Sequence, residues 1–237
     1  MSRVLLIRPR EQSERTAARL EALGHRCLID PVLAIRSLPL PELDLSDVAA
    51  VAVTSAHGAP AAADLPATLP VYAVGEATAR AIREATGRSV RVAEGDGVSL
   101  ARLIARDLPP DRGAILHLAG SEVSPGFPET LAESGHIYRR VTAYGAEPME
   151  GLGEACREAL LAGALDAVLF YSPRSARLWL GKVEEAGLAP TLERLTAVCI
   201  SAAVAQALTG RRFRSVLVAE EPSAAAMLRC LDAAGRR

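Results

Sequence analysis

Short apolar runs rich in β-branched residues alternate with alanine-rich segments along the chain, and this alternation constrains the fold most. Each run is apolar on both alternating faces, which is typical of parallel strands covered by helices on both sides. Segments of roughly ten residues with helical composition lie between them, as in repeated βαβ units. The sequence therefore predicts an α/β fold with parallel sheets flanked by helices. The expected strands are 3–8, 50–55, 70–75, 89–94, 114–120, 167–172, 197–201 and 215–220.

The same succession of strands and helices occurs twice. The run AVAVTS, ending in Ser55, corresponds to AVLFYS, ending in Ser172, at an offset of 117 residues. VYAVGEATARAI corresponds to AVCISAAVAQAL, with Gly75 on Ser201 and an offset of 126. We interpret this repeat as two similar domains. The repeat alone leaves open which strand–helix units belong to the same domain.

Two extended, proline-containing segments join the repeated blocks, at 30–42 and 140–148. Their composition is typical of connections between domains. We expect the chain to cross between the domains near 31–40 and 140–148, with a cleft between the domains.

Composition excludes several classes of protein. The formal net charge is −1 and aromatic residues make up 3% of the chain, which argues against a nucleic-acid-binding surface. The N-terminal stretch MSRVLLIRPR does not have the pattern of a signal peptide. No apolar run approaches the roughly 18 residues needed to span a membrane. We therefore expect a cytoplasmic protein that binds neither nucleic acid nor a membrane.

The sequence also lacks the motifs of metal and nucleotide sites. Its cysteines have no CxxC or zinc-type spacing, and its histidines are dispersed. It contains neither GxxxxGK[ST] nor a strand-linked GxGxxG. We expect buried or surface cysteines and histidines, and no metal.

Small polar residues stand where predicted strands end and helices begin. Ser55 and Ser172 can cap the helices that follow them, and Gly75 precedes a helix whose first turn contains Thr78. In open parallel sheets ligands bind beyond the carboxyl ends of the strands, and free helix N–H groups bind anions. One such segment is explained equally well as an ordinary N-cap. Matching segments in both halves favour a polyanion held from two sides.

Tyr144 breaks the repeat, because its counterpart in the other crossing is Leu33. A tyrosine hydroxyl beside a cleft can donate a proton. The alternative is an amphipathic tyrosine that packs on the connecting segment.

The ordered pattern VLLIRP, VTSAHGA, VYAVGEATA, VTAY, FYSPRSA, CIS and AEEP resembles the uroporphyrinogen-III synthase family. The resemblance runs from Arg3 to about Leu231. It implies a HemD-like fold with two similar α/β domains, a two-stranded antiparallel linker and an active site in the interdomain cleft. Residues 1–35 and 149–237 would form a discontinuous domain 1, and residues 38–146 would form domain 2.

The resemblance also implies a reaction. It is the cofactor-independent cyclisation, by a lyase, of the linear tetrapyrrole octacarboxylate hydroxymethylbilane to uroporphyrinogen III, with loss of water and inversion of ring D through a spiro-pyrrolenine. Transfer of substrate from hydroxymethylbilane synthase and a monomeric state are expected. Tyr144 would be the catalytic acid. The implied substrate-binding residues are Arg8, Ser55, Gly75, Thr78, Ser172 and Ser201.

Two departures from the family pattern concern the second half. The family often has Gly-x-x-Thr where this chain has Ser201–Val204, and the stretch 119–129 lacks an arginine often found there. Arg139 or Arg140 is a candidate substitute for that arginine. The alternative function is a two-domain, non-catalytic module that binds an anion or a tetrapyrrole.

Overall fold

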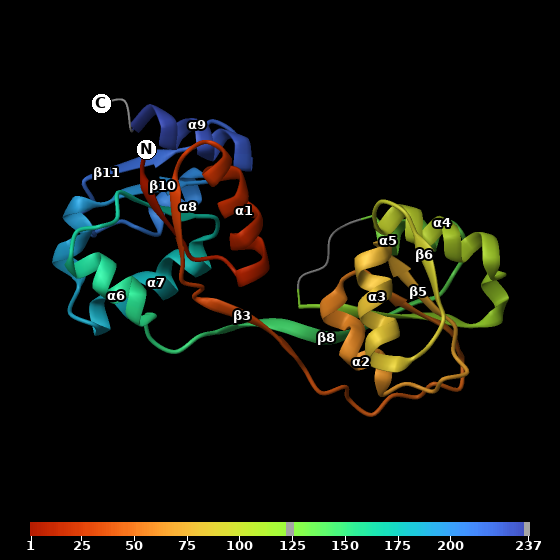
Figure 1. The fold of residues 1–237 in the computed structure, drawn as a ribbon. Helices are drawn as coiled ribbons and strands as arrows, with labels where there is room; N and C mark the ends of the chain where they lie inside the picture. The colour runs from red at the N-terminus through yellow and green to blue at the C-terminus, as the bar shows by residue number, and fades with distance from the viewer. Residues whose placement is uncertain (122–125, 235–237) are drawn as a thin grey trace. The chain divides into compact units, whose positions relative to one another are not determined.

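The computed structural model describes residues 1–121 and 126–234, and its contacts divide the chain into two compact units. The first unit contains Met1–Ala34 and Glu147–Arg237, and the second contains Ile35–Ala146. The chain therefore passes twice from one unit to the other. Each unit has one sheet with helices on both faces (Figure 1).

The first unit contains a five-stranded sheet in the order β11-β10-β9-β1-β2. All four neighbouring pairs are parallel. The strands are β1 (Arg3–Leu6), β2 (Arg26–Ile29), β9 (Ala167–Phe170), β10 (Thr196–Cys199) and β11 (Ser215–Val218). The helices are α1 (Arg10–Ala22), α6 (Glu154–Leu161), α7 (Pro173–Glu185), α8 (Ala202–Gln206) and α9 (Ala224–Ala234), with the 3-10 helix η3 (Ala189–Arg194).

Alternate side chains of these strands enter different cores. Val4, Leu169 and Val198 pack with residues of α1 and α9. Phe170, the next residue along β9, lies edge-on against Trp179 of α7, with ring centroids 5.6 Å apart. Both faces of the sheet are thus apolar and covered, which explains the continuous apolar runs in the sequence.

The second unit contains a six-stranded sheet in the order β3-β8-β7-β4-β5-β6. Its strands are β3 (Leu33–Ser37), β4 (Val48–Val53), β5 (Val71–Val74), β6 (Val90–Ala93), β7 (Ala114–Gly120) and β8 (Tyr138–Pro148). Its helices are α2 (Ala59–Ala63), α3 (Gly75–Thr86), α4 (Gly97–Asp107) and α5 (Phe127–Glu133), with 3-10 helices η1 (Ala56–Gly58) and η2 (Pro110–Arg112). Strands β4 to β8 are joined by parallel pairs.

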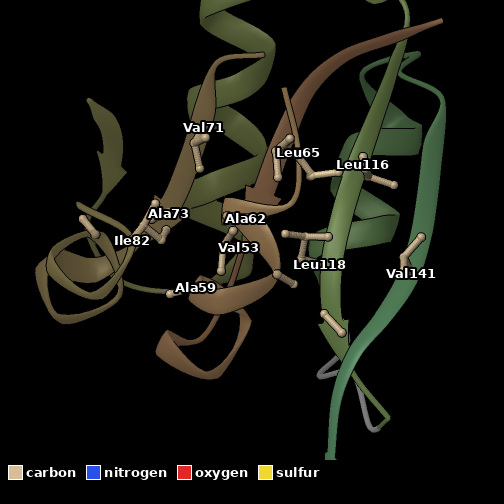
Figure 2. Close-up of a cluster of buried hydrophobic side chains, with 14 of the residues drawn as sticks. Val53, Ala59, Ala62, Leu65, Val71, Ala73, Ile82, Leu116, Leu118 and Val141 are labelled. Atoms are coloured by element: carbon tan, nitrogen blue, oxygen red, sulfur yellow. The ribbon is translucent and has the colours of Figure 1, made fainter. Parts of the chain in front are cut away.

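One core of this unit lies between the sheet and helices α2 and α3 (Figure 2). Val53, Leu116 and Leu118 from the strands meet Ala62 and Ile82 from the helices. On the other face Leu100 and Ile104 of α4 and Leu131 of α5 pack against the sheet. Most alanines of α2 are buried in the first of these two cores.

The two connecting segments are paired strands rather than loops. β3 lies beside β8 at the edge of the six-stranded sheet. In one unit the Leu38 N–H donates to the Ala143 carbonyl at 2.8 Å, and in the other the Met149 N–H donates to the Val32 carbonyl at 3.0 Å. The residue numbers run in opposite directions in these two bonds, so the strands are antiparallel.

The single lysine of the chain stabilises the end of β8 in the first unit. Lys182 on α7 is 8% exposed and its ammonium donates to the Met149 carbonyl. The Asp30 carboxylate accepts from the Gly153 N–H at 3.1 Å, where α6 begins. Both chain crossings are therefore anchored to this unit by side chains.

All the predicted strands are present, but those ending in hydroxyl residues were predicted too long at their carboxyl ends. β4 ends at Val53 and β9 at Phe170, so Ser55 and Ser172 start the next elements. Strand β2 was missed, because Arg26–Ile29 is a short edge strand with no fully buried residue.

We expect Ile82→Ala to destabilise the protein by about 3 kcal/mol, because it leaves a cavity in a fully buried core. Ile137→Ala is the matched control, since Ile137 is 59% exposed and its loss should change stability by less than about 0.5 kcal/mol. Urea unfolding measures both. Equal effects of the two substitutions would contradict the described core.

Candidate active site

The carboxyl ends of β4, β5 and β7 meet at one edge of the six-stranded sheet, because these strands are parallel neighbours. Ser55 follows β4, Gly75 follows β5, and Gly120 ends β7. Tyr144 on β8 pairs with Gly120. The predicted residues Ser55, Gly75, Thr78 and Tyr144 therefore all lie at this edge of the second unit.

Ser55 is the N-cap of the 3-10 helix after β4. Its Oγ accepts a long hydrogen bond of 3.4 Å from the His57 N–H. Because Oγ accepts in this bond, the Ser55 O–H remains able to donate to another acceptor.

Gly75 starts α3 with a φ of +73°, a conformation that favours glycine. An added Cβ there would meet no heavy atom within 4 Å, so the backbone beside Gly75 is open. Thr78 lies in the first turn of α3 and is only 6% exposed. Gly75 thus presents accessible backbone at the start of the helix, whereas Thr78 is buried.

The Tyr144 ring is half-buried against the core of the second unit and lies between two glycines. A Cβ added to Gly120 would be 2.6 Å from the ring carbon Cε2, and one added to Gly58 would be 3.7 Å from Cε1. The imidazole of His57 lies against the same ring, with centroids 5.7 Å apart and planes tilted by 47°. The ring is therefore held on several sides by unit 2 alone.

The backbone beside Tyr144 is fixed by Arg140. Its guanidinium donates to the Gly120 carbonyl at 2.7 Å and to the Ser121 carbonyl at 2.8 Å. The Ser121 N–H donates to the Tyr144 carbonyl at 3.0 Å.

Arg139 and Arg140 were the candidate partners for a substrate carboxylate, and the structure gives both of them other partners. Arg139 donates to the Asp47 carboxylate at 2.8 Å and to the Asp44 carbonyl at 2.7 Å. Arg140 is engaged by the backbone carbonyls just described. Residues 122–125 of the stretch 119–129 lie outside the described residues.

Thr54, the residue after β4, belongs to a buried chain of hydrogen bonds with His117 and Tyr138. His117 on β7 is 1% exposed; its Nε2 is 2.9 Å from Thr54 Oγ1 and its Nδ1 is 2.9 Å from the Tyr138 hydroxyl. Burial, assisted by the positive charge of Arg140, lowers the pKa of His117 to about 4. The imidazole is therefore neutral at pH 7 and orients two hydroxyl groups.

The other predicted residues lie at the carboxyl edge of the sheet in the first unit. Arg8 follows β1, and its guanidinium carbon lies 4.2 Å from the centroid of the Tyr171 ring, which follows the neighbouring strand β9. Partial burial is the main cause that lowers the pKa of Arg8. The stacking on Tyr171 orients a cation at the strand ends.

Ser172 and Ser201 stand at the starts of α7 and α8. Ser172 caps α7: its Oγ accepts from the Ser175 N–H at 3.1 Å and donates to Ser175 Oγ at 3.0 Å. Within the described part of the chain Ser201 Oγ makes no capping bond, although its carbonyl accepts from the Val204 N–H at 3.1 Å. The Val204 side chain is 1% exposed and belongs to the core.

Metal binding, thiol reactivity and membrane insertion are the remaining properties of the described residues that bear on function. They contain no group of three or more His, Cys, Asp or Glu residues arranged to hold a metal. Burial raises the pKa of the Cys27 thiol to about 11 and that of Cys199 to about 12, so neither is a reactive thiolate. Across 1–121 and 126–234, no helix is both long enough and apolar enough to cross a membrane.

Sequence reasoning found the strand-end residues but missed their surroundings. Gly58, Gly120 and the His57 ring line Tyr144, and His117 supports Thr54. Gly58 in VTSAHGA and His117 in AILHLAG are part of the sequence patterns discussed above. Their roles depend on contacts between strands that the sequence does not reveal.

The two parallel-stranded sheets and the helices on their faces define a two-unit α/β protein with polar residues at the strand ends. The model of the family "Uroporphyrinogen-III synthase HemD" matches residues 14–229. The chain therefore belongs to the uroporphyrinogen-III synthase family, an enzyme family of tetrapyrrole biosynthesis. A search of curated proteins found no match.

Solved structures of this family are similar over the whole length. Uroporphyrinogen-III synthetase from Helicobacter pylori is 19% identical, covers 100% of both chains and has a TM-score of 0.52, which shows a common fold. A mutant uroporphyrinogen III synthase from Thermus thermophilus is 25% identical, covering 100% of this chain and 99% of that one, with a TM-score of 0.49. A further Thermus thermophilus structure is 26% identical, covering 99% of each chain, with a TM-score of 0.45.

The lowered pKa of His117 predicts a loss of stability in acid. The neutral imidazole is favoured in the folded state, so its contribution is complete above the unfolded pKa of about 6.5 and is lost as the pH falls toward 4. The loss should amount to up to about 3 kcal/mol. In urea unfolding between pH 7 and 4.5, His117→Gln should reduce the slope of stability against pH. An unchanged slope would contradict the neutral buried imidazole.

Proposed function

We propose that the chain catalyses the reaction of its family, the cyclisation of hydroxymethylbilane to uroporphyrinogen III. The observation that carries the proposal is the location of Tyr144, held between Gly58 and Gly120 at the carboxyl edge of a parallel sheet. Ligands bind at this edge in open α/β sheets. Family membership supplies the reaction class, and Tyr144 supplies a proton donor.

The difficult first step is loss of hydroxide from the ring A hydroxymethyl group. In the proposed mechanism the Tyr144 phenol, directly or through a water molecule, donates its proton to that oxygen. The carbon–oxygen bond breaks, water leaves, and the pyrrole nitrogen lone pair stabilises the azafulvene cation.

The second part of the reaction sets the isomer. The substituted carbon of ring D attacks the azafulvene carbon and forms the spiro-pyrrolenine. The bond from that carbon to the ring C methylene then breaks, and the methylene joins the free α-carbon of ring D, so ring D is inverted. Loss of the α-proton restores aromaticity and balances the proton given by the phenol. No cofactor is consumed.

The eight carboxylates of this substrate require anion-binding groups, and the strand ends offer several. Free N–H groups begin α3 at the open backbone of Gly75. At the start of α7 the Ser175 N–H is already bonded to Ser172, so this helix end offers the partial positive charge of its dipole. Arg8 offers a cation already oriented by Tyr171. Ser55 and Ser201 offer hydroxyl groups, and we propose that the first turn of α3, which includes Thr78, binds through its backbone.

Tyr144→Phe should lower the rate of cyclisation by roughly 10²-fold without abolishing it, because a general acid contributes about 10²–10⁴-fold. The rate is measured with enzymatically generated hydroxymethylbilane, and folding is checked by circular dichroism. Tyr72→Phe is the matched control, since the Tyr72 hydroxyl is engaged by Arg91 at 2.8 Å. Full activity of folded Tyr144→Phe would remove Tyr144 from the mechanism.

Arg8→Met should raise KM for hydroxymethylbilane by roughly ten-fold, with a smaller change in kcat, because a charge-assisted contact to a carboxylate is lost. Arg229→Met on α9 is a control, because that arginine is exposed and pairs with Glu221. Steady-state kinetics distinguish the two variants. An unchanged KM in Arg8→Met would exclude Arg8 from substrate binding.

A further inference from the structure

The contact with the Tyr144 ring, and not the backbone conformation, restricts position 120 to glycine. Its φ is not in the left-handed region, so other residues could adopt its conformation. An added Cβ, however, would lie 2.6 Å from Cε2 of Tyr144, 3.0 Å from Cζ and 3.2 Å from the hydroxyl oxygen. The main chain of Gly120 thus lies along the edge of the ring that carries the hydroxyl.

A shift of strand register creates this contact. Ala119 of β7 pairs with Thr142 of β8, but the next residue, Gly120, pairs with Tyr144. One residue of β8, Ala143, is therefore skipped. Such irregularities re-aim a side chain, and here the residue placed opposite Gly120 is the tyrosine.

The backbone that touches the ring is itself held by hydrogen bonds. Arg140 donates to the carbonyls of Gly120 and Ser121, and the Ser121 N–H returns to the Tyr144 carbonyl. The opposite ring edge faces Gly58, whose own added Cβ would be 3.0 Å from Val53 Cγ1 and 3.1 Å from the Leu118 carbonyl. Neither glycine can gain a side chain without displacement of a neighbour.

We propose that Gly120 is a positioning residue that sets the location of the Tyr144 hydroxyl, with Arg140 fixing the backbone of Gly120. The catalytic consequence rests on the proposed function of Tyr144, whereas the positioning itself does not. In Gly120→Ala the ring must retreat by roughly 0.8 Å to reach a contact of 3.4 Å. A displacement of about 1 Å can cost roughly 10²-fold in rate.

The first test measures the ring directly. The chain has four tyrosines, so 13C-labelled tyrosine gives a small set of ring signals in NMR, and Tyr144→Phe identifies the signal of Tyr144. Gly120→Ala should shift that signal more than the others. Gly145→Ala is the matched control, because its Cβ would meet Leu38 at an ordinary 3.5 Å. An unmoved Tyr144 signal in folded Gly120→Ala overturns the proposal.

The second test separates positioning from a general structural effect. Gly120→Ala should lower kcat roughly ten- to hundred-fold with KM within about two-fold, and Gly145→Ala should change neither by more than about two-fold. In the Tyr144→Phe background Gly120→Ala should cost much less, since no hydroxyl remains to be positioned. An equal loss in both backgrounds would show a merely structural role and overturn the proposal.

Two further outcomes are decided by the same experiments. If Gly120→Ala does not fold, Arg140→Met releases the carbonyls of Gly120 and Ser121 without adding an atom beside the ring, and it must shift the Tyr144 signal for the proposal to stand. If Tyr144→Phe keeps its full rate, the proposed acid is wrong, while the NMR shift still decides whether Gly120 positions the ring.

Discussion

Parallel pairing of the strands is the constraint on which the rest of the structure depends. It brings the carboxyl ends of neighbouring strands to one edge of each sheet, so residues far apart in sequence become neighbours. Arg8 and Tyr171 meet in this way in the first unit. Gly120 and Tyr144 do so in the second, next to the strand that Ser55 follows. Helices on both faces are required to bury such sheets, which accounts for the alternation of apolar runs and alanine-rich segments.

The strand-end residues divide into structural and accessible groups. The Ser172 hydroxyl is engaged in capping α7, and Thr78 is buried in the first turn of α3. Gly75 and Ser201 have backbone or hydroxyl groups that the fold does not require for capping. Backbone amides therefore carry much of the proposed carboxylate binding. In that proposal they hold the same geometry whichever carboxylate of hydroxymethylbilane they meet.

Much of this was predictable from sequence because hydrophobic periodicity reports burial. Each apolar run became a strand, and Ser55 and Ser172 became N-caps as expected. Strand β2 escaped because its four residues lie at a sheet edge and include none that is fully buried. Local sequence carries a weak signal for such an edge.

The contacts between strands were not predictable from the sequence. The register shift that places Tyr144 opposite Gly120 depends on how β7 and β8 pair, and no local sequence pattern determines that pairing. Arg140 was a candidate for substrate binding, yet in the folded chain it serves two backbone carbonyls, because an arginine's partner is decided by the tertiary structure.

If the chain acts as proposed, the folded protein controls which isomer forms. The ratio of type III to type I uroporphyrin, obtained by oxidation and chromatography after the purified protein acts on hydroxymethylbilane, measures that control. We expect mainly type III product, whereas hydroxymethylbilane without the protein closes to type I. Type I alone from a pure, folded sample would contradict the proposed catalysis and favour a module that binds tetrapyrroles or other anions without chemistry.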